Sequence, residues 1–384
     1  MDMKGEIRKL ARIEEGPHPF LSLYLDTKWD DEQQRERIRL FTRNELKKVS
    51  DQIKDREEWR KAFAEDQQQI ERYVEGLVRR NYMQEVSGVA IFSCSGRGTF
   101  ATYPSIIPFE NRCYVSNLPT LQPLLRLSSQ YQNTLVVMVD TDSARLFEVS
   151  LEGMMDEISI ESYVPGRHDQ GGWAQMRYQR HIKDHMDKHH KEVADQLTEL
   201  FDTGRFKRIL LLGQDRILAN FKAFLSERVL QSIAETFPMD FSEGRPKILR
   251  QVFEHLLSKE KEEVNLEIQQ LKEKALKGGI ASFGLYGTLE ALNAGRVHTL
   301  YLLSSFSFPG AKCSQCGSLI QGAPKKSPSS PCPLCKGATQ AVDLGEEMGR
   351  SALRQDGDVK WVDEDAVLRE HDGAAAALRF RVSR

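Results

Sequence analysis

Two adjacent glycines and a nearby glutamine form the stretch of this chain that is best suited to chemistry. The segment reads Gly166-Arg-His-Asp-Gln-Gly-Gly-Trp-Ala-Gln175, so that Gly171 and Gly172 shortly precede Gln175. Glycine lets a backbone approach another molecule closely. A glutamine amide offers donors and an acceptor but no titratable proton. The segment therefore suits the delivery of a small polar group to a reacting centre, and a solvated surface loop is the alternative.

A basic, histidine-rich stretch follows this segment. Residues 166–191 hold six Lys or Arg against three Asp, and five of the nine histidines. A stripe of cations is what contacts with phosphates require, and such contacts give affinity without reading a base sequence. The stretch therefore predicts an RNA-binding helix face, with an ordinary solvated face as the alternative. Apolar residues at helical spacing predict a helix after Gln175 that packs on a sheet, namely Tyr178, Ile182, Met186, Val193, Leu197 and Leu200.

The candidate RNA contacts come from both the loop and the helix. The indole of Trp173 can stack on a base. His168 could be a general base, but we favour a residue that anchors the loop or binds phosphate. A metal site at His181, His185 and His189 is disfavoured, because the neighbouring cations would repel a metal ion. The candidate set comprises Arg167, His168, Trp173, Arg177, Arg180, His181, Lys183, Lys188 and Lys191.

Four of the six cysteines form two Cys-x-x-Cys pairs. Cys313 and Cys316 are separated from Cys332 and Cys335 by fifteen residues, which lies within the spacing of a four-thiolate zinc site. The intervening sequence is too polar and too rich in proline to form a packed element. Because all four ligands are thiolates, the predicted zinc ion is structural and not catalytic.

Composition limits the class of protein. A chain of 384 residues with 40% hydrophobic and 29% charged residues predicts a soluble, folded protein of two or three domains. The net charge is −2, so any contact with nucleic acid must come from a local patch. We find no apolar run that could cross a membrane and no secretion signal. Together with the paired cysteines, this predicts a cytoplasmic protein.

Periodicity predicts three α/β domains with mixed sheets, separated near residues 130 and 275. Residues 1–130 form the first domain, residues 131–275 the second and residues 276–384 the third. The third carries a zinc ribbon at 311–337. A long charged helix over 250–277 is expected to span between domains, and Gly278-Gly279 to end it.

Individual elements follow from short patterns. Strands are expected at 20–25, 86–94, 134–140, 144–150, 208–213, 299–303, 359–362 and 376–382. Helical patterns cover 30–80, 218–237, 285–293 and 344–355.

Several of these segments together resemble the archaeal and eukaryotic class-1 peptide chain release factors. That family carries Gly-(Lys/Arg)-His-x-x-Gly-Gly-Gln before a basic helix, and this chain has Gly166-Arg-His-x-x-Gly-Gly172 followed by Gln175. Residues 277–285, 291–300 and 372–380 and the zinc insertion are similar to the family's third domain. The resemblance covers residues 134–384 and extends to Pelota and bacterial relatives.

The resemblance implies work in the ribosomal A site. There the Gly-Gly-Gln tip enters the peptidyl-transferase centre and helps water to attack the ester between peptide and tRNA. Gly171, Gly172 and Gln175 become the candidate catalytic residues. The basic helix would meet ribosomal RNA and the acceptor end of peptidyl-tRNA. The family's third domain also contacts a translational GTPase or other partner. Neither a membrane nor DNA is an expected partner.

The chain departs from the family pattern in two places, and both change the function that we expect. Trp173 occupies the family's Gln position, so that Gln175 is displaced by two residues. In addition, the first domain lacks the Asn-Ile-Lys-Ser segment with which the family reads stop codons. We therefore expect ribosome rescue or quality control, not ordinary translation termination.

Three hypotheses remain open. The first is a peptidyl-tRNA hydrolase that acts on stalled or aberrant ribosomes, with Gln175 positioning water. The second is a non-hydrolytic factor that occupies the A site for hibernation, protection or recycling. The third, weaker one is a free RNA-binding or nuclease-like protein, which the lack of a carboxylate-rich metal site argues against.

Overall fold

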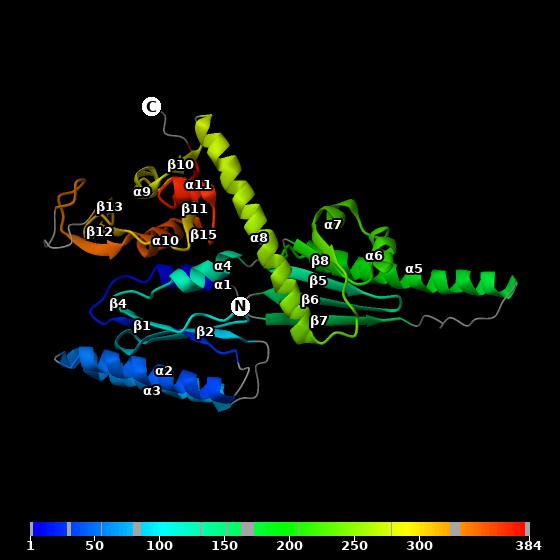
Figure 1. The fold of residues 1–384 in the computed structure, drawn as a ribbon, viewed down its shortest axis with the longest axis horizontal. Coiled ribbons are helices and arrows are strands. Elements are labelled where there is room, and N and C mark those ends of the chain that lie inside the picture. Colours follow the sequence, from blue (N-terminus) through cyan, green and yellow to red (C-terminus); the bar gives the residue numbers. More distant parts are fainter. Residues whose placement is uncertain are drawn as a thin grey trace. The chain divides into compact units, whose positions relative to one another are not determined.

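The chain is known from a computed structural model. It describes residues 3–28, 32–54, 56–79, 86–130, 133–150, 153–162, 173–206, 208–277, 279–322 and 331–380. These residues form two compact units (Figure 1). Unit 1 comprises residues 1–130 and 255–384, and unit 2 comprises residues 131–254. The segments that the sequence predicts as the first and third domains thus lie in one unit.

The N-terminal part of unit 1 is built on an antiparallel sheet of order β3-β2-β1-β4. The strands are β1 (Phe20–Asp26), β2 (Gly88–Cys94), β3 (Thr99–Ser105) and β4 (Arg112–Ser116). Figure 1 shows helices α2 (Glu32–Gln52) and α3 (Glu57–Arg79) on one face of this sheet, and α1 (Met3–Ala11) and α4 (Gln122–Gln130) on the other. The expected strands at 20–25 and 86–94 are confirmed. Strands β3 and β4 are missed by the sequence, because they are partly exposed and lack a run of apolar residues.

The predicted helical region over 30–80 is two helices, not one. A single helix of that length would extend about 75 Å. The strands that it covers have only seven residues, so most of such a helix would extend past the sheet. The break after Gln52 lets both helices bury their apolar faces against the same sheet. Ile38, Leu46 and Val49 of α2 pack there together with Ile70 and Val74 of α3.

The C-terminal part of unit 1 has a mixed sheet of order β10-β16-β11-β15. Strand β11 (Val297–Leu303) runs parallel to β15 (Asp358–Val362) and antiparallel to β16 (Ala374–Leu378), which pairs with β10 (Ala281–Phe283). Helices α9 (Leu285–Asn293), α10 (Leu344–Arg354) and α11 (Ala366–Glu370) complete this part. A second sheet, β13-β12-β14, carries the cysteines on β12 (Pro309–Cys313), β13 (Leu319–Gln321) and β14 (Thr339–Asp343).

The long charged helix is α8 (Arg245–Leu276), and its residues from His255 onward belong to unit 1. Glu267 of α8 fixes it to the sheet, accepting hydrogen bonds from the Tyr301 hydroxyl at 3.0 Å and from Lys360 Nζ at 2.8 Å. At its end the N–H of Gly279 donates to the carbonyl of Lys274 at 2.7 Å. A Cβ at Gly279 would lie 2.5 Å from that oxygen, which explains the glycine.

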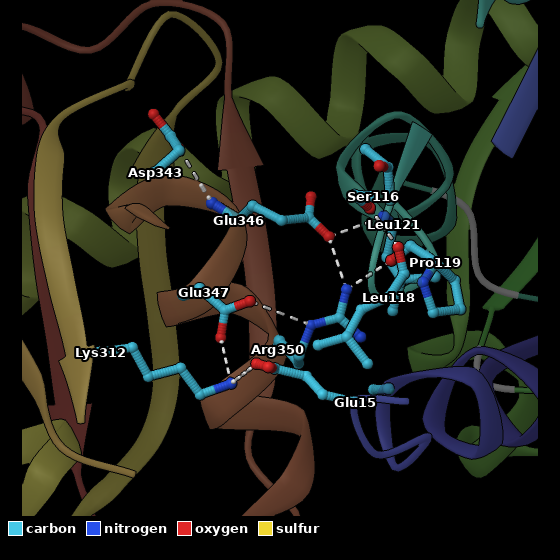
Figure 2. Close-up of polar contacts among 12 residues, drawn as sticks. Glu15, Ser116, Leu118, Pro119, Leu121, Lys312, Asp343, Glu346, Glu347 and Arg350 are labelled. Carbon is cyan, nitrogen blue, oxygen red and sulfur yellow. Dashed lines mark hydrogen bonds and ion pairs between the residues drawn. The ribbon is translucent and has the colours of Figure 1, made fainter. Parts of the chain in front are cut away.

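Helix α10 joins the two parts of unit 1 through its charged residues (Figure 2). The Glu346 carboxylate accepts the backbone N–H groups of Leu121 at 2.8 Å and Gln122 at 3.0 Å, at the start of α4. An anion at a helix N-terminus satisfies N–H groups that lack a partner within the helix. The buried Arg350 guanidinium pairs with Glu346 at 3.0 Å and donates to the carbonyl of Pro119. The N-terminal part is therefore anchored on the C-terminal part by buried charge.

Unit 2 contains one mixed sheet of order β7-β6-β5-β8-β9. Strands β5 (Thr134–Val139), β6 (Ser143–Ser150) and β7 (Gly153–Glu161) are antiparallel neighbours, while β8 (Arg208–Leu212) and β9 (Ile233–Phe237) run parallel to β5. Helix α5 (Trp173–Asp202) packs on this sheet with the short helices α6 (Asp215–Lys222) and α7 (Glu227–Gln231). The expected α/β architecture is thereby confirmed, with mixed sheets in unit 2 and in the C-terminal part of unit 1, whereas the sheet of the N-terminal part is antiparallel and not mixed.

The predicted helix over 218–237 is wrong. The chain forms α6, then α7, and then strand β9, which pairs with β8. Ser226 caps α7 by accepting the N–H of Val229, which starts a new helix within the predicted one. Pairing with the sheet then overrides the helical spacing of the apolar residues beyond Ser232. Among the helices that the structure describes, none combines the length and apolarity needed to span a bilayer.

Candidate metal centre and candidate RNA interface

The four cysteines of the ribbon converge, as their spacing predicts. The sulfur atoms of Cys313, Cys316, Cys332 and Cys335 all lie within 4.8 Å of one another. The Sγ atoms of Cys313 and Cys335 are 3.4 Å apart, and those of Cys316 and Cys332 are 3.7 Å apart. A tetrahedral ion with metal–sulfur bonds of about 2.3 Å would separate its ligands by about 3.8 Å. The group therefore has the size of a four-thiolate metal site, and all four cysteines are free thiols.

Backbone groups around the sulfurs favour their charged form. The N–H groups of Gln315 and Cys316 both point to Cys313 Sγ at 3.4 Å, and that of Gly337 points to Cys335 Sγ at 3.4 Å. The bond from Cys316 is the main cause that lowers the pKa of the Cys313 thiol. The hydrogen bond with the Ser318 hydroxyl lowers the pKa of Cys316 to about 6. The hydrogen bond with Cys313 helps to raise the pKa of Cys335, so the metal-free sulfurs share a proton, which a metal would displace on binding the thiolates.

The ribbon is attached to the C-terminal sheet through side chains as well as through the chain itself. Asn293, at the end of α9, donates to the carbonyl of Leu319 at 2.8 Å and accepts the N–H of Leu319 at 2.9 Å. Gly310 lies so close to Leu344 that a Cβ would meet its side chain at 2.4 Å. These contacts make the cysteine cluster part of the folded unit.

Part of the loop that the sequence singles out lies outside the described residues. This holds for Arg167, His168, Gly171 and Gly172. Helix α5 begins at Trp173, so Trp173, Gln175 and Arg177 belong to its first two turns. The prediction of a helix that starts only after Gln175 is therefore wrong by three residues. The run from Trp173 to Met176 has neither Gly nor Pro, so nothing in it prevents helix formation.

The described cations of the candidate RNA interface are all exposed residues of α5. The set is Arg180, His181, Lys183, Lys188 and Lys191. Further along the helix, Val193, Leu197 and Phe201 are buried in the core of unit 2, with Leu200 partly buried beside them. The predicted packing stripe is confirmed for Val193, Leu197 and Leu200.

Charge is distributed unevenly along α5. Residues 180–191 contain four Lys or Arg and two Asp, whereas residues 192–202 contain four Asp or Glu and no Lys or Arg. A helix dipole favours anions near the N-terminus and cations near the C-terminus. The charges of α5 have the opposite order, so the helix dipole does not account for them.

Two histidines of this stretch have a structural role that the sequence does not reveal. His189 is buried and its Nδ1 lies 2.9 Å from the Ser162 hydroxyl, at the end of β7. His190 is fully buried, and the centroid of its ring lies 5.7 Å from that of Phe221 and 5.9 Å from that of Phe224. Burial lowers the pKa of both histidines. Since His181 is exposed while His189 is buried, these histidines do not form one site, and among the described residues only the cysteines converge as potential metal ligands.

Comparison with known proteins supports the resemblance. Residues 119–256 match the family described as bacterial archaeo-eukaryotic release factor family 10. A peptide chain release factor subunit 1 from Methanocaldococcus jannaschii is 24% identical over 335 residues, covering 77% of this chain and 79% of that protein. The corresponding protein from Methanococcus maripaludis is 24% identical over 280 residues, covering 64% of this chain and 66% of the relative. The match thus spans just under two thirds of the latter protein.

Among solved structures, Pelota from Archaeoglobus fulgidus is 17% identical, with 77% of this chain and 80% of that chain covered and a TM-score of 0.36. An archaeal translation termination factor is also 17% identical, with 98% of each chain covered and a TM-score of 0.26. The family match includes the Gly-Gly segment and the basic stretch that follows it. Over residues 119–256 the chain is thus similar to a release-factor-like family, and over most of its length it is similar to archaeal peptide chain release factors.

Proposed function

We propose that this protein is a ribosome-binding translation factor of the release-factor type that docks through the first half of α5. The observation that carries the proposal is the concentration of exposed cations on residues 180–191, in an order that opposes the helix dipole. Exposed cations gathered on one stretch of a helix can bind an anionic partner. Phosphates of ribosomal RNA and of the tRNA acceptor end match these cations.

The position of this face within the chain supports the same function. Residues 180–191 follow directly on the segment that carries Gly171, Gly172 and Gln175, and the family match over 119–256 includes all of them. The relatives in that superfamily are named peptide chain release factors. A ribosome in the cytoplasm, with its RNA and peptidyl-tRNA, is therefore the partner we infer. A translational GTPase is a further inferred partner, which the resemblance of the third predicted domain implies.

Co-sedimentation with bacterial ribosomes tests this function. We expect the protein to pellet with ribosomes at low salt and to be released as salt rises, because phosphate contacts release counterions. The double variant Lys188→Ala/Lys191→Ala should lower the slope of log affinity against log salt by roughly two. The matched control is Arg216→Ala/Lys222→Ala on α6 of the same unit, which should leave the slope unchanged. Equal slopes for both double variants would refute docking through α5.

A second candidate activity is hydrolysis of peptidyl-tRNA with Gln175 orienting the water. The observation that favours it is that Gln175 lies in the first turn of α5, where backbone N–H groups have no partner within the helix. Such groups can stabilise the negative charge that develops on the ester oxygen. Gly171 and Gly172 would then permit the close approach to the ester. A non-hydrolytic docking factor, in which Trp173 and the basic face only bind RNA, is the alternative.

Peptide release from ribosomes that carry labelled peptidyl-tRNA separates these two activities. A hydrolase releases peptide, and Gln175→Ala should abolish release while co-sedimentation stays intact. Release that is unaffected by Gln175→Ala would refute the assignment of Gln175. Ribosome binding without release from stalled complexes would favour the docking factor.

The cysteine cluster fits a structural zinc ion, which we propose as the resident metal. Four thiolates fill a tetrahedral shell and leave no position for a substrate, so the ion would stabilise the ribbon and take no part in a reaction. The ligands would be Cys313, Cys316, Cys332 and Cys335. Because the segment between the two cysteine pairs has no packed core of its own, zinc would supply folding energy there.

A further inference from the structure

The first residues of the chain form a strap over the C-terminal part of unit 1. We define the N-terminal strap as residues 3–15, which comprise α1 and the four residues after it. Helix α1 buries Ile7, Leu10 and Ala11. Arg354, the last residue of α10, donates to the carbonyls of Ala11 and Ile13, both at 2.7 Å. A cation that satisfies the final carbonyl groups of a helix also complements its dipole. The strap is therefore held by specific polar contacts as well as by apolar burial.

The strap ends at the base of the ribbon. Glu15 accepts hydrogen bonds from Gln340 Nε2 at 2.9 and 3.0 Å and from Lys312 Nζ at 3.4 Å. Lys312 and Gln340 are directly opposed partners of β12 and β14, and the next pair in the ladder is Cys313 and Thr339. The hydrogen bond from Gln340 is the main cause that lowers the pKa of Glu15, so the contact is made by the carboxylate. Glu15 thus joins the two strands one residue away from a metal ligand.

Helix α10 braces the same lysine from a second direction. Lys312 Nζ lies 2.9 Å from Glu347 Oε2, and the side chains of both residues are only 12% exposed. Glu347 in turn lies 3.5 Å from Nε of the buried Arg350. Figure 2 shows Lys312 between Glu15 and Glu347, with Arg350 beside them. The orientation of β12 therefore depends on both the strap and α10.

We propose that the N-terminal strap and the metal centre stabilise each other, so that metal occupancy controls how firmly residues 3–15 are docked. The proposal rests on the metal centre assigned above and adds a regulatory consequence to it. Without a metal, the two cysteine pairs lose the cross-link at the end of the β12–β14 ladder, where Cys313 is paired with Thr339, and this end of the ladder can fray. Lys312 and Gln340 then no longer present a fixed pair of donors to Glu15. Coupling between two sites is reciprocal, so loss of the Glu15 contact must weaken metal binding by the same factor.

Release of the metal from the full-length protein tests one direction of the coupling. The protein is reduced, its metal content is measured, and release to a coloured chelator is followed in time. We expect Glu15→Ala to accelerate release roughly fivefold, the effect of losing one partly buried ion pair with its hydrogen bonds. Gln340→Ala should act in the same direction. The matched control is Glu65→Ala, an exposed glutamate of α3, which should leave the rate unchanged.

Hydrogen exchange tests the reverse direction. Stripping the metal from the wild type should increase deuterium uptake in residues 3–15 while leaving α2 and α3 protected. Unchanged protection of the strap on metal removal, or an unchanged release rate in both Glu15→Ala and Gln340→Ala, would overturn the coupling although the metal centre stands. A purified protein that binds no zinc, cobalt or cadmium would overturn the metal centre and the coupling together. The ribosome-binding proposal is independent of all these outcomes, because its test concerns unit 2.

Discussion

The imidazole Nδ1 of His189 lies 2.9 Å from the hydroxyl oxygen of Ser162. This contact fastens the middle of α5 to the end of β7, next to the segment that carries the candidate catalytic residues. His189 and its neighbour His190 are both buried, and burial lowers the pKa of each imidazole. The stretch of α5 that carries the exposed cations is therefore anchored to unit 2 by two buried histidines, and their lowered pKa values favour the neutral imidazole.

We predict that unit 2 loses stability as the pH falls below about 6.5, the pKa of a histidine in an unfolded chain. The unfolded chain then takes up protons that folded His189 and His190 resist, so the free energy of unfolding falls by at most about 1.4 kcal/mol per pH unit for each histidine. The loss ends once the pH has passed the lowered pKa values of the folded state. Denaturant unfolding at pH 7.5, 6.5 and 5.5 measures the effect. His190→Leu should flatten the profile, whereas exposed His181→Gln should not; a profile that is equally steep in His190→Leu would contradict the prediction.

Removal of the Arg350 guanidinium should destabilise unit 1 strongly. Arg350→Met leaves the Glu346 carboxylate buried without its ion pair, and breaking a buried pair in this way costs about 3–5 kcal/mol. Chemical denaturation followed by tryptophan fluorescence measures the loss. Arg369→Met is the control, since Arg369 pairs with Glu364 at an exposed site where an ion pair contributes about 0–1 kcal/mol. Similar decreases of the free energy of unfolding in the two variants would show that the ion pair of Arg350 and Glu346 stabilises the unit no more than an exposed pair does.

Metal analysis should find one zinc ion per chain in the reduced protein, because four thiolates complete a tetrahedral site. Cys313→Ser should remove it and expose the ribbon to proteolysis. Cys113→Ser, at a thiol of β4 far from the ribbon in sequence, should leave the metal content unchanged. Full metal content in Cys313→Ser would exclude that residue as a ligand.

Gly213 should resist substitution more than Gly204 does. Both have a positive φ, +150° and +72°, but a Cβ at Gly213 would lie 2.4 Å from the carbonyl oxygen of Val139, while a Cβ at Gly204 meets nothing within 4 Å. Gly204→Ala should therefore cost only the backbone strain of about 1–2 kcal/mol. Gly213→Ala adds a clash with β5 and should cost clearly more. Thermal unfolding of the two variants tests the difference, and equal losses would mean that the chain after β8 relaxes freely.

Much of the architecture can be predicted from the sequence wherever a local pattern is compatible with only one kind of structure. The β-branched run at 134–139 and the apolar run at 208–212 form strands because they are buried on both faces of a sheet. The two Cys-x-x-Cys pairs converge because their short spacing makes each pair a compact knuckle. Local spacing decides these features, so no tertiary information is needed.

Other features depend on contacts between residues that are far apart in the chain. Residues 233–237 look helical by spacing but form a strand, because β8 offers a free edge. His189 and His190 look like members of a basic stretch, yet the core of unit 2 encloses them. The sequence by itself determined the resemblance to release factors, the α/β class and the convergence of the cysteines, since these follow from local pattern and motif. Only the tertiary structure decided that α10 joins the first and last parts of the chain, because Glu346 meets Leu121 across more than two hundred residues.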